Sequence, residues 1–165
     1  MKNNKHLPIF GVGPFYVITI FIITIIFLTL NYLDLISSGR FIALKIPFII
    51  IGVILIILGI IMWTIAVFKD KIDKSILNNS LCKTGVYSLS RNPIYSAFLI
   101  INTGILLFTY NLYLLVLPFV YYFFLTILII HTEEKWCINE FKNEYLSYMK
   151  KVNRIIPLPR RKKGE

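Results

Sequence analysis

The residues of this sequence best suited to chemistry lie in one run before an apolar stretch, Gly85-Val86-Tyr87-Ser88-Leu89-Ser90-Arg91-Asn92-Pro93-Ile94-Tyr95. Asn92 followed by Pro93 is typical of a helix start, with an N-cap residue and a first-turn proline. The free amides of such a turn attract anions, and Arg91 adds a positive charge beside them. The run therefore predicts a carboxylate or phosphate site. The alternative is that Arg91 only extends to lipid headgroups.

A second group of polar residues, His131-Thr132-Glu133-Glu134, ends another apolar stretch. In an unbroken helix His131 and Glu134 share the face of an aromatic stripe that follows, and a carboxylate on that buried side needs a partner. Glu133 would point about 100° away. The alternative is an acidic helix start that helps to end a membrane span.

The composition shows which elements must position these residues. The chain has 165 residues, 57% of them hydrophobic and 16% charged, with a mean hydropathy of +0.73. A soluble domain is about 45–50% apolar and about 25% charged, so a water-soluble globule is excluded. The net charge of +10 is interpreted as a membrane-topology signal and not as a sign of nucleic-acid binding. The two cysteines have no CxxC spacing, so we expect no metal site.

Four apolar stretches predict an all-α integral membrane protein with about four transmembrane helices. They cover residues 14–36, 42–68, 93–108 and 112–130. The first two exceed the ~20 residues that span a bilayer, and the last two form a tight hairpin. Helices are expected because an open strand cannot satisfy its backbone in lipid. The whole chain, 1–165, is read as one membrane domain, with two N-terminal spans in 14–68.

The basic residues predict the orientation. With these spans, sixteen Lys and Arg side chains share one side, and only Arg40 and Lys45 fall on the other. The positive-inside rule then places both termini and the long central loop in the cytoplasm, in a multi-pass protein of the cell (inner) membrane.

A C-terminal amphipathic helix is predicted on the cytoplasmic side after the fourth span. Its apolar positions recur at steps of four, three, four and three: Ile138, Phe141, Tyr145, Tyr148 and Val152. Such a helix either lies on lipid headgroups or folds back against the central loop.

In order and spacing, several short motifs resemble the isoprenylcysteine carboxyl methyltransferases and their bacterial relatives, including the phospholipid methyltransferases. They are Thr84-Gly85-Val86-Tyr87, Arg91-Asn92-Pro93-Ile94-Tyr95, Glu133-Glu134, Phe141 with Glu144-Tyr145 and Tyr148, and the segment 152–157. The resemblance covers about residues 79–157, which it marks as a methyltransferase-like, cofactor-binding region.

The resemblance implies an integral-membrane methyltransferase that binds S-adenosylmethionine without a Rossmann domain. The residues that it places at the cofactor are Leu81, Tyr87, Arg91, Asn92, Pro93, Tyr95 and one of the two glutamates. The family places Glu133 there, whereas the stripe argument prefers Glu134, and a kink after His131 would reverse the helical projection. We expect Arg91, Glu133, Glu134 and Tyr95 to carry the reaction.

The sequence departs from the family pattern at three positions. Asn92 stands where His is frequent, Lys142 where Gly is usual, and His131 alone represents an upstream basic residue. These changes leave the cofactor assignment in place and the acceptor open.

The predicted reaction is methyl transfer to the carboxylate of a lipidic, isoprenylcysteine-like substrate at the cytoplasmic face. An ionised carboxylate needs alignment and desolvation rather than a base. The alternative is a phospholipid amine, which needs a base to remove a proton. From another class, a small transporter or structural membrane protein is disfavoured because the spans hold no Asp or Glu away from their ends. The expected partners are the lipidic substrate and membrane lipids, with no nucleic acid and no metal.

Overall fold

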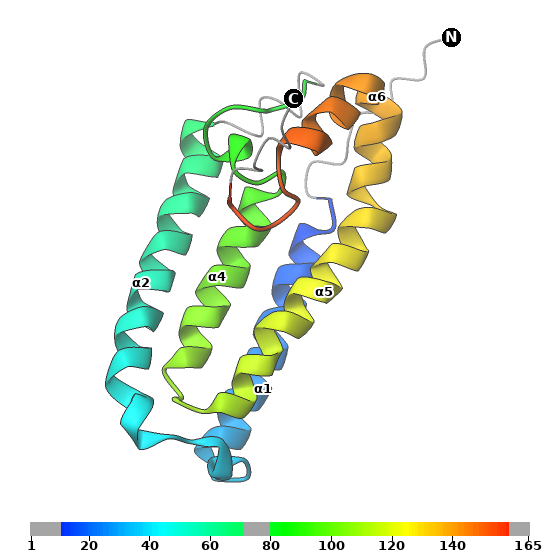
Figure 1. Cartoon of the computed structure of the whole chain (residues 1–165). Coiled ribbons are helices and arrows are strands. Elements are labelled where there is room, and N and C mark those ends of the chain that lie inside the picture. Colours follow the sequence, from blue (N-terminus) through cyan, green and yellow to red (C-terminus); the bar gives the residue numbers. More distant parts are fainter. Residues whose placement is uncertain (1–10, 71–79, 159–165) are drawn as a thin grey trace.

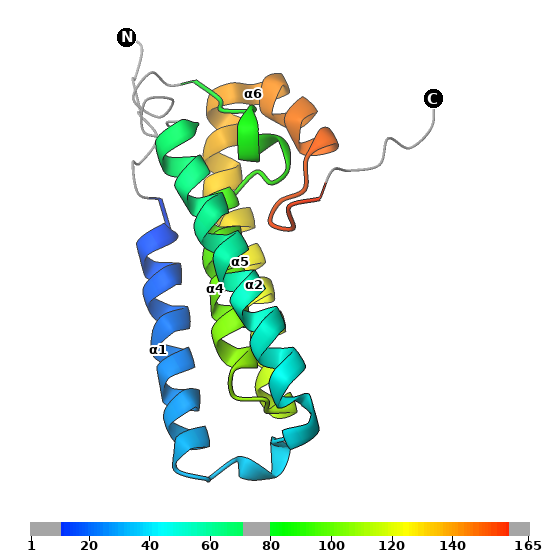
Figure 2. The same cartoon turned by 90° about the vertical axis from the view of Figure 1, so that its left-hand side faces the viewer.

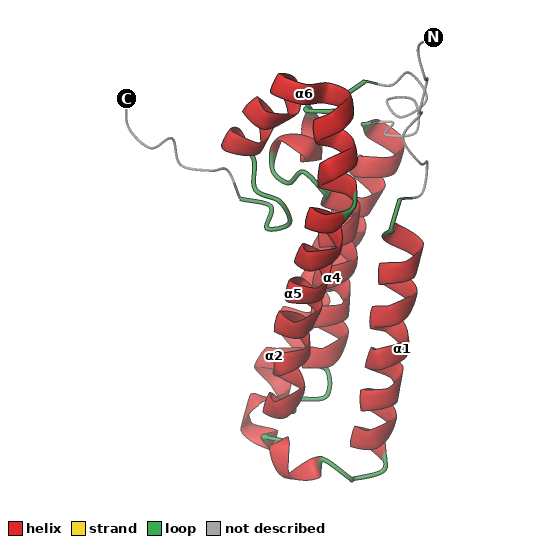
Figure 3. Cartoon of the chain, turned by 90° about the vertical axis from the view of Figure 1, so that its right-hand side faces the viewer, coloured by secondary structure: helices red, strands yellow, loops and turns green. Residues whose placement is uncertain are grey.

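Long apolar helices lie side by side along the molecule in the computed structural model, which describes residues 11–70 and 80–158 (Figure 1). The four long helices of the bundle are α1 Gly13–Tyr32, α2 Lys45–Thr64, α4 Pro93–Leu107 and α5 Val116–His131. The helix α6, Glu133–Lys151, follows α5 at one end. Within the described residues the remaining elements are single turns of helix and loops, without strands (Figure 3). The predicted all-α class is confirmed.

Three helices of the described chain are long and apolar enough to cross a membrane. They are Gly13–Tyr32, Ile42–Lys69 and Leu112–His131, where the second includes the π-helical turn η3 Ile65–Lys69 and the third the 3-10 turn η5 Leu112–Leu115. The helix α4 has 15 residues, or about 22 Å at about 1.5 Å per residue, against a hydrocarbon core of about 30 Å. The chain is therefore a membrane protein, and the count of four spans stays a prediction.

The predicted ends of the spans agree with the structure except at the end of the first. The helix α1 stops at Tyr32, whereas the apolar stretch was drawn to residue 36. Asp34 has a φ of 60°, in the left-handed region, which a right-handed helix cannot contain. The apolar stretch of the sequence extends past the end of the helix because Leu33, Leu35 and Ile36 are apolar.

Glycines bring α2 and α4 together. A Cβ atom on Gly52 would lie 2.8 Å from the carbonyl oxygen of Gly104, and one on Gly59 would lie 2.9 Å from that of Ala97. Small residues allow helix backbones to approach closely in lipid, where packing rather than hydrophobicity drives association. The remaining faces of α2 carry exposed side chains such as Ile54 and Ile61, which suit contact with acyl chains.

The core between α1, α4 and α5 contains a buried polar contact in addition to apolar residues such as Ile20, Leu125 and Ile129. Thr24 Oγ1 donates to Asn102 Oδ1 at 2.8 Å and lies 2.9 Å from the hydroxyl oxygen of Tyr121. These bonds satisfy polar groups where neither water nor lipid can do so. They fix α1, α4 and α5 relative to one another within the bundle.

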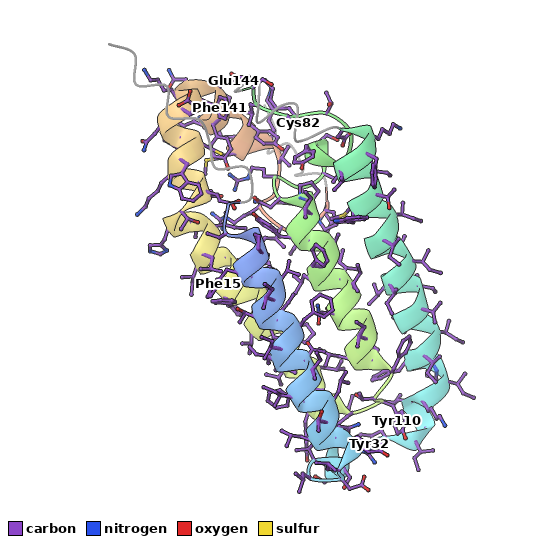
Figure 4. All side chains as sticks on the ribbon, turned by 180° about the vertical axis from the view of Figure 1, so that it is seen from behind. Phe15, Tyr32, Cys82, Tyr110, Phe141 and Glu144 are labelled. Carbon is purple, nitrogen blue, oxygen red and sulfur yellow. The ribbon has the colours of Figure 1, made fainter. Side chains whose placement is uncertain are left out.

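The helix α6 folds back against the central loop, which is one of the two arrangements that the sequence analysis left open. Tyr145 and Tyr148 pack with Leu81, and the Tyr148 hydroxyl donates to the carbonyl of Tyr87 at 2.5 Å. Lys83 pairs with Glu144 at 2.6 Å. Figure 4 shows Cys82, Phe141 and Glu144 together at this end, far from Tyr32 and Tyr110 at the other.

A sharp bend inside α6 makes this return possible. Lys142 has φ 46° and ψ −123°, which are not helical values, and the chain changes direction in this part of α6 (Figure 2). Glycine adopts such values without steric cost. The Gly that is usual at this position in the resembled family thus has a physical reason, and here a lysine takes the same backbone conformation.

Candidate functional site

Two arginines from distant segments meet on one buried carboxylate at the α6 end of the bundle. Arg91 Nη2 lies 2.8 Å from Glu134 Oε1, and the two side chains are 5% and 6% exposed. Arg154 donates from Nε to Oε1 at 2.7 Å and from Nη2 to Oε2 at 3.0 Å. The group of Arg91, Glu134 and Arg154, named here the Arg–Glu–Arg triad, carries one net positive charge. Such charge-assisted, bidentate bonds are the strong ones in proteins.

The C-terminal segment that carries Arg154 is fixed to the start of α4. The main-chain N–H of Arg91 donates to the carbonyl of Asn153 at 2.9 Å, and Asn92 Nδ2 donates to the carbonyl of Arg154 at 2.9 Å. The hydroxyls of Ser90 and Ser96 also donate to the carbonyls of Arg154 and Ile155. These contacts bring Arg154 to Glu134. The sequence analysis did not single out Arg154.

Glu133 has a different set of partners, from α1 and α4. Its Oε1 accepts from the Tyr95 hydroxyl at 2.5 Å and from the main-chain N–H of Val12 at 3.0 Å. No described residue forms an ion pair with it, and no hydrogen bond from the described chain reaches Oε2. The described partners therefore reach only one oxygen of this carboxylate.

A break in the helix lets both glutamates enter the same region. Thr132 has φ −123° and ψ −86°, so α5 ends at His131 and α6 begins at Glu133 in a new direction. Glu134 is buried on the side of the aromatic stripe and has a partner, as the stripe argument predicted, and this partner is cationic. His131, which the same argument placed on that face, is exposed because the helix breaks after it. Glu133 still reaches Tyr95, which an unbroken helix would not have predicted.

The pKa values at this end follow from burial and charge. Burial raises the pKa of Glu133 above its ordinary value of 4.5, against the lowering effect of its bonds from Tyr95 and Val12. The hydrogen bond with Glu134 raises the pKa of Arg154, so this guanidinium stays charged. Burial also raises the pKa of Cys137 to about 12, which keeps its thiol protonated. Cys137 is therefore not a nucleophile at neutral pH.

The remaining predicted cofactor residues lie around this region. Tyr87 is buried against Ala66 and Val86 in the 3-10 turn η4 Gly85–Ser88, and Leu81 packs on Tyr145. The conformation of η4 depends on Gly85, whose φ of 56° lets its turn approach the Asp70 carboxylate.

Asn92 and Pro93 begin α4 as predicted, with Asn92 at the N-cap position, but the asparagine side chain does not cap the helix. Asn92 occupies the N-cap position without a capping hydrogen bond, because its amide donates to the C-terminal segment instead. The first turn of α4 therefore has no side-chain cap, and Arg91 has a buried Nε without a partner among the described residues. Both features leave donors for an anionic group.

A cavity of about 270 Å³ opens beside the triad. It is slightly smaller than the ~300–1,000 Å³ of typical small-molecule sites. Polar and apolar residues from the start of α4, from α5 and from the C-terminal segment line it: Arg91, Tyr122, Val152, Asn153, Arg154, Ile155, Ile156 and Leu158. A charged group and an apolar chain of one ligand can thus both find partners here.

The fold and these contacts define an α-helical membrane protein with a buried acid–base site at one end of its bundle. A family model described as phospholipid methyltransferase matches residues 44–144, more than half of the chain. The chain belongs to this family and is therefore of the membrane methyltransferase class. No curated protein and no solved structure matches it. The matched range contains Arg91, Tyr95 and both glutamates, whereas α1 and Arg154 lie outside it.

Proposed function

We propose that this protein transfers a methyl group from S-adenosylmethionine to a lipidic acceptor at the cytoplasmic face of the cell membrane. The observation that supports this most is that the Arg–Glu–Arg triad and the Glu133–Tyr95 hydrogen bond lie at the same end of an apolar bundle. Because the chain belongs to a methyltransferase family, methyl transfer is the reaction that we assign to these residues. The cytoplasmic orientation rests on the sixteen basic residues assigned to the side of the site.

The described residues fit the cofactor. Arg91 Nε is a buried donor without a partner among the described residues, and the start of α4 lacks a side-chain cap, so together they suit the methionine carboxylate. Glu133 Oε2 suits the ribose hydroxyls or the amino group, and Tyr87 and Tyr95 suit packing on the cofactor. S-adenosylmethionine supplies an electrophilic methyl group on a sulfonium. The chain aligns the acceptor and excludes water.

The favoured acceptor is a carboxylate on a lipidic, isoprenylcysteine-like substrate. The net positive charge of the triad attracts an anion, and an ionised carboxylate needs no base. Ile155, Ile156 and Leu158 line the cavity beside Arg154 and suit an apolar chain. A substrate with one charged end and one apolar chain also explains why the enzyme lies in a membrane.

A phospholipid amine is the second candidate, and one observation favours it. Glu133 has no cationic partner among the described residues, and burial raises its pKa, so it suits a proton acceptor. The description of the matching family names phospholipids. In this version the ammonium group gives a proton to Glu133 Oε2, and the neutral nitrogen then accepts the methyl group.

Calorimetric titration of the purified protein with S-adenosylhomocysteine tests cofactor binding. We expect micromolar binding that is lost in Arg91→Ala. Lys83→Ala is the matched control, because it removes an exposed cation from the same end, so its affinity should equal that of the original chain. Absence of binding by the original chain, in a sample with a cooperative thermal transition, would exclude the proposed function.

The chemical stability of the labelled product separates the two acceptors. With a methyl-labelled donor and native membranes, a methyl ester releases volatile label in alkali, whereas an N-methyl group retains it. The pH dependence gives a second criterion, since a carboxylate acceptor predicts a flat rate between about pH 6 and 9 and an amine predicts a rising one. Alkali-stable label with a rising rate would replace the first candidate by the second.

A further inference from the structure

The first residues of α1 touch the carboxylate that the proposed reaction uses. Val12 donates its main-chain N–H to Glu133 Oε1 at 3.0 Å, and it is the N-cap residue of α1. Four residues further on, Tyr16 packs edge-on against Tyr95, with ring centroids 6.2 Å apart. The start of the first helix thus contacts both members of the Glu133–Tyr95 hydrogen bond.

Two glycines make this close approach possible. A Cβ atom on Gly11 would lie 2.1 Å from Glu133 Oε1, and one on Gly13 would lie 2.7 Å from Tyr95 Cε1. Gly11 also has a φ of 48°, which L-residues with a side chain rarely adopt. Gly11 thus faces Glu133 and Gly13 faces Tyr95, one glycine for each member of the Glu133–Tyr95 hydrogen bond.

We propose that residues 11–13, named here the N-terminal clamp, position Glu133 for catalysis by holding Oε1 and leaving Oε2 to face the ligand. This inference rests on the proposed function for its catalytic part only. The clamp supplies a main-chain N–H where the neighbouring Glu134 has two guanidinium groups. The positive end of the α1 dipole adds to the same effect.

The surroundings of Glu133 show why a main-chain donor matters. Among the described residues, the titratable groups around it are Tyr95 on α4, Cys137 on its own helix and the adjacent Glu134, and none of these is a cation. The charges of Arg91 and Arg154 are engaged by Glu134. Within the described part of the chain, the clamp and the Tyr95 hydroxyl are therefore the groups that stabilise the ionised form of Glu133, and loss of the clamp favours its protonated form.

The clamp also gives the first helix a place in the site. The family match begins at residue 44 and the motif resemblance at about residue 79, so neither includes α1. The contact joins this helix to residues of α4 and α6.

A pair of variants at one position tests the contact itself. Val12→Pro removes the N–H, and the φ of −90° at this residue is close to the range of proline. Val12→Ala keeps the N–H and removes only the side chain. In detergent, Val12→Pro should lower the midpoint of thermal unfolding by several degrees more than Val12→Ala does. In a Glu133→Ala background this difference should vanish. An equal difference in both backgrounds would overturn the contact, whatever the protein catalyses.

Ligand binding and the pH profile test the catalytic part. Loss of one charge-assisted hydrogen bond should make S-adenosylhomocysteine binding about tenfold weaker in Val12→Pro than in Val12→Ala, which keeps the N–H. The acid limb of the methyl-transfer profile should move to higher pH in Val12→Pro and in Gly11→Ala. A folded Val12→Pro protein with unchanged affinity and an unmoved acid limb would overturn the positioning role. Failure of the original chain to bind would instead count against the proposed function, and the thermal comparison would still decide the contact.

Discussion

Arg91 Nη2 lies 2.8 Å from Glu134 Oε1, and this ion pair is almost completely buried. Arg154, in the C-terminal segment that follows α6, forms a second ion pair with the same carboxylate. The attraction of this carboxylate for both guanidinium groups offsets the repulsion between the two cations. Glu134 therefore binds the C-terminal segment to the start of α4, and the geometry of the cavity depends on it.

Replacement of Glu134 should destabilise the protein strongly. Glu134→Gln leaves the buried guanidinium of Arg91 and the partly exposed guanidinium of Arg154 without a counter-charge, and removal of one partner from a buried pair costs about 3–5 kcal/mol. Unfolding in mixed micelles measures this loss. Glu144→Gln is the control because it breaks an exposed pair and should change stability by less than about 1 kcal/mol. A small effect of Glu134→Gln would show that the triad does not hold the site together.

Replacement of Lys142 by glycine should stabilise the protein. The φ of 46° and ψ of −123° at this bend strain any residue with a side chain, at about 1–3 kcal/mol, part of which the greater chain entropy of glycine offsets. We expect a net gain of about 1 kcal/mol in Lys142→Gly. Lys142→Ala separates strain from charge, since it removes the ammonium group and keeps the strained backbone. Equal gains in both variants would show that charge and not backbone strain is responsible.

The titration of Glu133 should give the stability a specific pH dependence. A carboxyl group with a raised pKa in the folded state binds more protons there than in the unfolded chain. Its contribution to the free energy of unfolding is therefore complete below about pH 4. This contribution is lost as the pH rises through the pKa of Glu133 in the folded state. The difference in unfolding midpoint between the original chain and Glu133→Gln should change with pH in this sense. A constant difference from pH 4 to 8 would contradict the raised pKa.

A methyl group on Gly52 should separate α2 from α4. The added Cβ would lie 2.8 Å from the carbonyl oxygen of Gly104, which is main chain and cannot rotate away. We expect Gly52→Ala to cost about 1–3 kcal/mol by overpacking. Val53→Ala, on an exposed face of the same helix, should be nearly neutral. Unfolding in mixed micelles distinguishes the two, and equal stability of both variants would show that α2 adjusts without cost.

The sequence by itself determined the helical membrane class, the positions of the apolar helices and the amphipathic stripe of α6. These properties depend on local composition and on periodicity, which lipid and the helix enforce. The motif order also indicated the methyltransferase family, and the match over residues 44–144 confirms this family. The burial of Glu134 and its need for a partner were predicted from the stripe as well.

Only the tertiary structure decided how the two glutamates are used. The break at Thr132 sends Glu133 to Tyr95 and Val12, and the fold of the C-terminal segment brings Arg154 to Glu134. No local pattern marks Arg154 or the glycines at the start of α1, because their partners are remote in the chain. The periodicity of a sequence reports which face of a helix is apolar, whereas contacts between segments arise only when the whole chain is packed.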